Sequence, residues 1–143
     1  MPDYRKGAHT VYDIHYHFVW VTKYRYQVWR GETAERAREI IRQMCVSREM
    51  TSLKGPVSVD HVHLRVSCPP SLSPAQIAHY IKGISSRKLQ DEFPLLKKRY
   101  WGQHLWARGY LCGTVGAVTQ EQIKDYSDHP LLDTSHQNFS IDT

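Results

Sequence analysis

Hydrophobic and polar positions follow an alternating, strand-like pattern in several parts of the chain. From Thr10 to Lys23 they alternate every second residue, and Val57 to Cys68 has a similar pattern after a break at Lys54-Gly55-Pro56. Side chains on a strand point alternately to the two faces of a sheet, so both segments are predicted to be strands. A further strand is predicted within Tyr100 to Val115, where glycines interrupt the apolar residues.

Between these strands, apolar residues recur at helical spacing. This pattern predicts a helix from about Glu32 to Met50. Ser73-Pro74-Ala75-Gln76 predicts the start of a second helix, with serine as N-cap, proline at the first helical position and glutamine two positions later. A similar start at Thr119-Gln120-Glu121-Gln122 predicts a last helix that carries Tyr126.

The order of these elements predicts an α+β fold. We expect a ferredoxin-like or RRM-like βαββαβ sandwich with an antiparallel sheet and an added C-terminal helix that carries the tyrosine. A chain of 143 residues has the length of one ordinary domain. We assign residues 1–130 to that domain and residues 131–143 to a polar C-terminal tail.

The composition indicates a protein outside membranes and without disulfides. No apolar run approaches the roughly 20 residues that span a bilayer, and the first residues lack the apolar stretch of a secretory leader. We therefore expect a cytoplasmic location and no membrane partner. The odd number and the scattered positions of the cysteines argue against a disulfide framework and a zinc knuckle, and predict free buried thiols. They are Cys45, Cys68 and Cys112.

The charge of the chain favours a polyanionic partner. Lysine and arginine total 19 against 14 acidic residues, which gives a net charge of +5 and a pI near 9.2. Several cations adjoin aromatic residues: Lys23 and Arg25 flank Tyr24, Arg108 precedes Tyr110, and residues 97–99 run into Tyr100 and Trp101. Such a pattern can hold phosphates while the rings stack on bases. A solvated basic face with inward-turned rings is the alternative.

His61 and His63 form the strongest candidate metal site. Two histidines one residue apart on a strand point to the same face, so both imidazoles can hold one ion. Asp60 could orient one of them. An open site completed by an oxygen ligand, water and a substrate phosphate suits Mg²⁺ or Mn²⁺. An incidental pair is the alternative. His15 and His17 repeat the spacing and could form a rival pair or serve a structural role.

Tyr126 supplies a candidate nucleophile. A tyrosine brought near a bound divalent ion can attack a phosphodiester and keep the phosphoryl group covalently. Taken alone, Tyr126 is better explained as a core residue. Its position on an N-capped helix becomes informative only together with the histidine pair.

Several segments together resemble the single-tyrosine HUH transposases of the small insertion-sequence group numbered 200/605. The resemblance runs from about His9 to Tyr126. It is carried by Asp60-His61-Val62-His63-Leu64, Lys23-Tyr24-Arg25, Tyr80-Ile81-Lys82-Gly83-Ile84-Ser85-Ser86, Trp106 to Tyr110 with Thr114-Val115-Gly116, and Ile123-Lys124-Asp125-Tyr126.

The resemblance implies a DNA transposase that cleaves and rejoins single-stranded DNA. His61 and His63 would hold the divalent metal, and Tyr126 would attack the scissile phosphate, release a 3′-OH and become linked to the 5′ phosphate. Such enzymes are homodimers that bind hairpins at transposon ends, and the tyrosine helix commonly completes the partner subunit's site. Lys82, Arg87 and Lys88, on or after the second helix, would contact hairpin phosphates, unless they form a solvated surface.

One position departs from the family pattern. The family usually carries a glutamine, the third metal ligand, four residues after the tyrosine, where this chain has Pro130. His129, three residues after Tyr126 and on much the same helical face, could replace it. Otherwise the site keeps two protein ligands plus water, or this copy is inactive.

Three other functions remain open from the sequence. The first is a domesticated relative that acts on repetitive palindromes. The second is a non-catalytic RRM-like nucleic-acid-binding protein, which would not need the histidines or Tyr126. The third is a metal-dependent hydrolase with water as nucleophile, which would form no covalent adduct with DNA.

Overall fold

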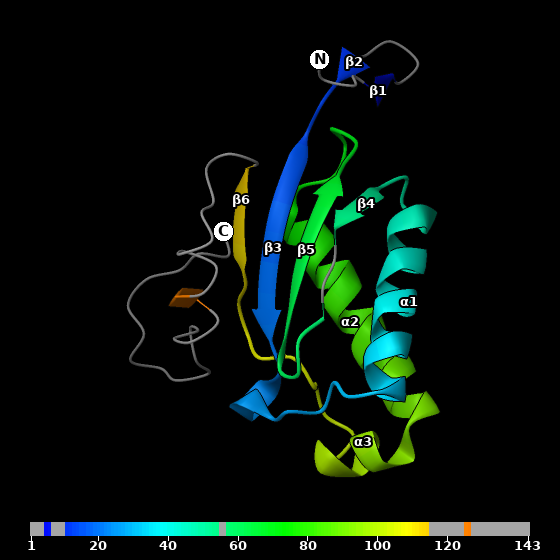
Figure 1. Ribbon diagram of the computed structural model, residues 1–143. Helices are drawn as coiled ribbons and strands as arrows, with labels where there is room; N and C mark the ends of the chain where they lie inside the picture. Colours follow the sequence, from blue (N-terminus) through cyan, green and yellow to red (C-terminus); the bar gives the residue numbers. More distant parts are fainter. Residues whose placement is uncertain (1–4, 7–10, 55–56, 115–124, 127–143) are drawn as a thin grey trace.

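A four-stranded antiparallel sheet runs through the molecule in the order β4-β5-β3-β6 (Figure 1). The computed structural model describes residues 5–6, 11–54, 57–114 and 125–126. The strands are β3 (His15–Val21), β4 (Thr51–Lys54), β5 (His61–Ser67) and β6 (Leu111–Thr114). β3 and β5 are the central pair, and all three pairings in the sheet are antiparallel.

Two long helices cover one face of this sheet (Figure 1). They are α1 (Glu32–Ser47) and α2 (Pro74–Glu92), and the short α3 (Pro94–Arg99) follows α2. The sandwich thus has the element order βαββαβ, with the first strand between the third and the fourth. This arrangement confirms the predicted α+β, ferredoxin-like fold. A separate pair, β1 (Arg5–Lys6) with β2 (Val11–Tyr12), precedes it.

Local sequence signals explain where both long helices begin. At α2 the Ser73 side chain accepts from the Gln76 amide and the Gln76 side chain accepts from the Ser73 amide, so the predicted capping box is confirmed. α1 begins at Glu32, as predicted, and its first turn carries Glu32 and Glu35, whose charges favour the positive end of the helix dipole.

The strands are shorter than the alternating pattern predicted. The first predicted strand is divided into β2 and β3 between Tyr12 and His15. The second begins at His61 rather than Val57, which makes only an isolated bridge to Val62. Alternating hydrophobic residues indicate which side chains face the core. Side chains can face the core at residues whose backbones do not pair with a neighbouring strand, so the pattern extends beyond the strand.

Two elements of the sandwich were not located from the sequence. α1 was expected to continue to Met50 but ends at Ser47, and β4, which was not predicted, begins at Thr51. Glu49 has a positive φ of 59° there, which ends the helical path. α3 begins with Pro94, directly after α2. The predicted capping box at Thr119, residues 127–130 and the tail 131–143 lie outside the described residues, so those predictions stand untested.

The core lies between the sheet and the helices. It includes three buried tryptophans, and Trp106 contacts both of the others: its ring centroid lies 5.7 Å from Trp20 and 5.2 Å from Trp29. Cys45 and Cys68 are buried and Cys112 is half-buried, all as free thiols. Burial raises the pKa of Cys45 and of Cys112 to about 11. Within the described residues, no helix has both the length and the apolarity to cross a membrane.

A buried polar network fastens the segment before β6 to α2. The Trp106 indole donates to the Ser85 hydroxyl at 2.9 Å, and the Leu105 amide donates to the Ser86 hydroxyl at 3.2 Å. Gln90 donates to the Gln103 carbonyl. These bonds hold the chain that leads into β6 against the helix layer.

Replacing Ser85 with alanine tests this network. Ser85→Ala leaves the buried Trp106 indole without this acceptor, so we expect a loss of about 1–3 kcal/mol in the free energy of unfolding. Urea denaturation measures the loss. Ser71→Ala, at an exposed position, is the matched control and should change stability by less than about 0.5 kcal/mol. Equal unfolding midpoints for the two variants would show that the indole finds another partner.

Candidate active site on the open face of the sheet

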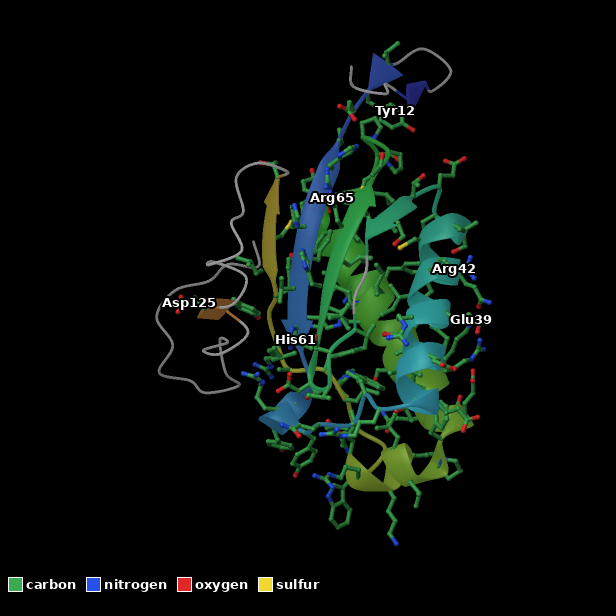
Figure 2. The ribbon with its side chains drawn as sticks, in the orientation of Figure 1. Tyr12, Glu39, Arg42, His61, Arg65 and Asp125 are labelled. Atoms are coloured by element: carbon green, nitrogen blue, oxygen red, sulfur yellow. The ribbon has the colours of Figure 1, made fainter. Side chains whose placement is uncertain are left out.

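The two histidines of β5 point away from the helices. Val62 and Leu64 on the same strand are buried in the core between sheet and helices, whereas His61 and His63 alternate with them and are half-buried. Figure 2 places His61 at the beginning of β5, near the end of β3. This alternation confirms the prediction that the two histidines lie on the same face of the sheet.

His61 is oriented by the residue that precedes it. Its Nδ1 lies 2.9 Å from an Asp60 carboxylate oxygen, and the other oxygen of Asp60 accepts from the Arg25 guanidinium at 2.9 and 3.0 Å. Asp60 is buried, so the cation offsets the cost of removing its charge from water. A carboxylate only accepts hydrogen bonds, so Nδ1 of His61 carries a proton and Nε2 faces away.

His63 contacts a histidine from the neighbouring strand. Its Nε2 lies 2.9 Å from Nδ1 of His17, and the rings stack with centroids 5.2 Å apart. Burial, followed by the charge of Arg65, lowers the pKa of His17, so this ring is neutral at pH 7. His15 instead contacts Asp13 at 3.0 Å. The two histidines of the rival pair thus have different partners, and metal binding by that pair stays an untested alternative.

Tyr126 packs on the same face as the histidine pair. Its side chain is 7% exposed and belongs to a small cluster with Val19, Val21 and Ala107. Val19 and Val21 lie directly across the β3–β5 ladder from His63 and His61, respectively. Residues that are far apart in sequence are thus gathered on one surface.

This surface has suitable donors for a divalent ion. Two imidazoles share a face, and the one held by Asp60 has the carboxylate–histidine arrangement that commonly orients metal ligands. Nε2 of His63, however, is in contact with His17, so an ion bound by this nitrogen would have to replace that contact. Within residues 11–54, 57–114 and 125–126, no three His, Cys, Asp or Glu side chains converge as a ligand set. His129, Pro130 and Gln137 lie outside the described residues.

The predicted DNA-binding cations differ in their exposure and in the contacts that they make. Some already bind protein groups: Arg25 pairs with Asp60, and the Lys82 ammonium donates to the Ala107 and Gly109 carbonyls at 2.8 and 2.9 Å. Lys23 is half-buried in a short 3-10 turn, Lys23–Arg25. The remaining three, Arg87, Lys88 and Arg108, are exposed. Phosphate binding by all six stays a prediction.

Two residues gain importance from the structure. Asp60 was a candidate from its position beside His61, and the observed contact supports that role. His17 was expected to serve the sheet, yet it contacts His63 directly. The spacing of His17, Val19 and Val21 showed that they share a face, but only the strand register reveals which residues they meet.

Comparison with known proteins identifies related sequences over almost the whole chain. The family model described as "Transposase IS200 like" matches residues 10–129. The Salmonella typhimurium transposase for insertion sequence element IS200 is 36% identical over 131 residues, which cover 92% of this chain and 86% of that protein. The Deinococcus radiodurans ISDra2 transposase is 35% identical over 122 residues, 85% of this chain and 87% of that protein.

Solved structures agree with these sequence matches. A crystal structure from Deinococcus radiodurans R1, described as a candidate transposase, has a TM-score of 0.78 and 32% identity, and the match covers 87% of this chain and 95% of that one. A REP-associated tyrosine transposase bound to a REP hairpin has a TM-score of 0.51 at 15% identity, over 90% of this chain and 68% of that one. The second likeness supports the fold alone.

The Asp60 contact predicts the tautomer of His61. At pH 8 we expect the proton on Nδ1, and long-range ¹⁵N–¹H NMR spectra should show this form in the wild type and lose it in Asp60→Ala. Asp13→Ala is the matched control: Asp13 contacts Nε2 of His15, so this change should alter His15 and leave His61 unchanged. An Nε2-protonated His61 in the wild-type protein would contradict the assigned contact.

Proposed function

This chain belongs to the IS200-like transposase family, and from that premise we propose that it cleaves and rejoins single-stranded DNA through a phosphotyrosine intermediate formed by Tyr126. Membership in the family implies an enzyme that cleaves and joins DNA. The nucleophile, the metal site, the form of the DNA substrate and the assembly of subunits are the parts that we propose.

One observation carries the choice of nucleophile. Tyr126 packs on Val19 and Val21, and their cross-strand partners are the two histidines of β5. A tyrosine buried between sheet and helices could not reach a DNA strand, whereas the open face of the sheet is where a strand could approach both groups. This placement favours Tyr126 as nucleophile over a role in the main core, which is formed on the opposite face.

The proposed reaction exchanges one phosphoester for another. The Tyr126 oxygen forms a bond to phosphorus while the bond from phosphorus to the 3′ oxygen breaks; the phenol gives up its proton and the departing 3′ oxygen gains one. The product is a 5′-phosphotyrosine and a free 3′-OH. Attack by the 3′-OH of another strand reverses the exchange, so joining requires no external energy source.

His61 and His63 are the residues that we propose as metal ligands. A Mg²⁺ or Mn²⁺ ion held by these two residues would supply Lewis acidity toward the scissile phosphate. Asp60 keeps His61 in the tautomer whose Nε2 lone pair is available. We propose His129 as a further ligand, because this chain has Pro130 where the family usually carries a glutamine.

Hairpins at the transposon ends are the proposed DNA targets. The REP-associated transposase, which shares the fold, is bound to a REP hairpin in its structure, and we extend that mode of recognition to this chain. The exposed cations of α2, Arg87 and Lys88, offer charge for hairpin phosphates. We also propose a homodimer. In the packing described above Tyr126 lies against the sheet of its own chain, and exchange of the tyrosine segment between two chains would place it instead at the histidines of the partner.

The central test is the formation of a covalent adduct. The protein is incubated with Mg²⁺ or Mn²⁺ and labelled single-stranded DNA from the flanks of its own gene, and the products are resolved on a denaturing gel. We expect an adduct that survives denaturation, disappears with EDTA and is absent in Tyr126→Phe, because phenylalanine has no oxygen to attack phosphorus. Loss relative to wild type should exceed about 100-fold.

Tyr16→Phe is the matched control for the loss of a hydroxyl. Tyr16 lies on β3 but packs against Phe18 on the helix-covered side of the sheet, so this variant should form the adduct normally. An adduct that persists in Tyr126→Phe would refute the nucleophile. Hairpin binding without adduct or cleavage in either metal would indicate a non-catalytic binding protein or an inactive copy. Metal-dependent cleavage without adduct would indicate a hydrolase.

Mixed dimers test whether active sites are shared. Tyr126→Phe chains and chains with both His61→Ala and His63→Ala are each expected to be inactive. If the tyrosine serves the partner's site, their heterodimer contains one intact site, and random co-assembly should restore about a quarter of the wild-type adduct. No restoration in a confirmed heterodimer would show that each Tyr126 serves the sheet of its own chain.

A further inference from the structure

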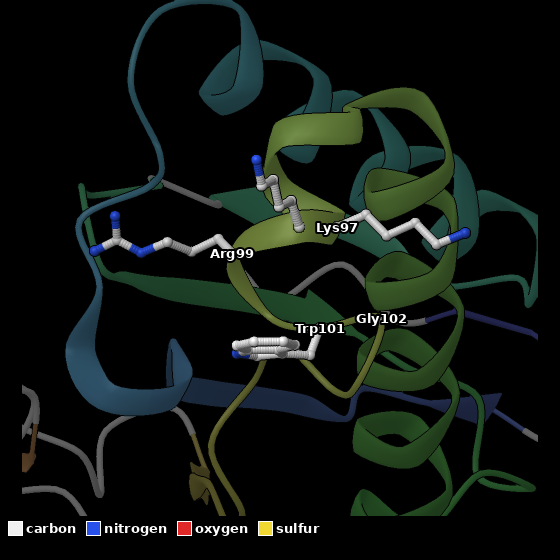
Figure 3. A pocket seen from close by; sticks show the side chains of 5 residues that line it. Lys97, Arg99, Trp101 and Gly102 are labelled. Atoms are coloured by element: carbon white, nitrogen blue, oxygen red, sulfur yellow. The ribbon is translucent and has the colours of Figure 1, made fainter.

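A basic surface hollow lies beside α3, outside the set of residues that form the candidate active site. Lys97, Lys98, Arg99, Trp101 and Gly102 line it (Figure 3), and we call this set the α3 hollow. Its volume is about 460 Å³, and it is open to solvent. Three of the five lining residues are cations and none is acidic, so the hollow attracts anionic groups.

Trp101 is displayed in the hollow instead of being buried. The residue is 88% exposed, whereas the other three of the four tryptophans are almost completely buried. The turn that carries it is held by backbone hydrogen bonds: the Trp101 amide donates to the Lys98 carbonyl, and the Gly102 amide donates to the Lys97 carbonyl. The exposed indole is thus presented by an ordered turn.

Aromatic rings connect this region with the 3-10 turn at the end of β3. The Tyr100 and Tyr26 ring centroids lie 5.4 Å apart, as do those of Tyr26 and Tyr24, and the Arg99 guanidinium lies 4.0 Å from the Tyr26 ring centre. Burial raises the pKa of Tyr100 to about 12, so its hydroxyl remains protonated and donates to the Lys23 carbonyl. Tyr100 is buried and Tyr24 is exposed, so this row of packed rings links the hollow through the interior to a second exposed aromatic side chain at the 3-10 turn.

The row ends close to the histidine site. Arg25, in the same 3-10 turn as Tyr24, forms the ion pair with Asp60, and Asp60 contacts His61. Figure 1 shows α3 at the end of the molecule where β3 ends and β5 begins. One extended DNA strand could contact the hollow and the proposed active site at the same time.

We propose that the α3 hollow binds an unpaired nucleotide of the DNA substrate, with its base stacked on Trp101 and its phosphates held by Lys97 and Lys98. The ligand class rests on the proposed function, which makes single-stranded DNA the substrate. An exposed indole offers a flat face, and only an unpaired base has a free face to place against it. The lysines supply charge for phosphates without specifying a base. An acidic peptide would use the charge but has no comparable use for the indole.

The fluorescence of Trp101 provides a direct assay. Because the other tryptophans are buried, acrylamide at moderate concentration should quench mainly Trp101 emission in the free protein. We expect the oligonucleotide (dT)12 at low salt to quench the emission on binding and to protect it from acrylamide. A blunt DNA duplex without unpaired bases should do neither. Tyr126→Phe protein can be used throughout, because binding requires no chemistry.

Two neighbouring exposed residues provide matched variants. Trp101→Ala should weaken (dT)12 binding, measured by anisotropy of labelled DNA, by about 5- to 150-fold, the range that corresponds to the loss of one base–aromatic stack. Leu95→Ala, 82% exposed on α3 but not lining the hollow, should leave the affinity unchanged. Replacing both Lys97 and Lys98 with alanine should reduce the salt dependence of binding by about 1.4 in log–log slope.

Three outcomes would overturn the proposal. They are equal affinities of Trp101→Ala and Leu95→Ala for (dT)12, equal quenching by the duplex, and equal protection by poly-glutamate, which would indicate an acidic protein partner. The adduct assay separates this failure from failure of the proposed function. An adduct without Trp101 quenching would refute the hollow alone, and quenching without adduct would refute the catalytic proposal alone.

Discussion

The antiparallel register of β3 and β5 is the constraint on which the candidate site depends. It places Val21 across from His61 and Val19 across from His63, so a hydrophobic pair and a polar pair share one face. A slip of one residue would turn both histidines into the core and leave Val62 exposed. The register is therefore fixed by core packing on the helix side, and the same packing determines the geometry on the open side.

A single buried carboxylate links this sheet face to the turn at its end. Asp60 binds the imidazole of His61 with one oxygen and the guanidinium of Arg25 with the other. Burial of an unpaired carboxylate would be costly, so removal of either partner would disturb the other contact. Arg25 was predicted to bind DNA because aromatic residues flank it in the sequence. In the structure it also stabilises the orientation of His61 through Asp60.

The sequence could predict those features that depend on residues close together in the chain. The capping box at Ser73 and the shared face of His61 and His63 depend on residues close in sequence, and both are present. β4 is a short edge strand stabilised by pairing with β5, with no strong pattern of its own. The contact between His17 and His63 requires the register of two distant strands. The partner of Lys82 likewise follows from the tertiary position of the Ala107 carbonyl, which one sequence does not reveal.

The tryptophans show why composition alone could not separate core from binding surface. Trp106 packs against other indoles and donates its N–H to Ser85, so both its apolar body and its polar edge are satisfied inside the protein. Trp101, a few residues earlier in a similarly basic and aromatic stretch, has an ordered backbone but an exposed ring. A side chain held in place without burial contributes little to folding through the hydrophobic effect. Its orientation toward solvent beside Lys97 and Lys98 therefore makes intermolecular contact the better physical explanation for an indole at this position.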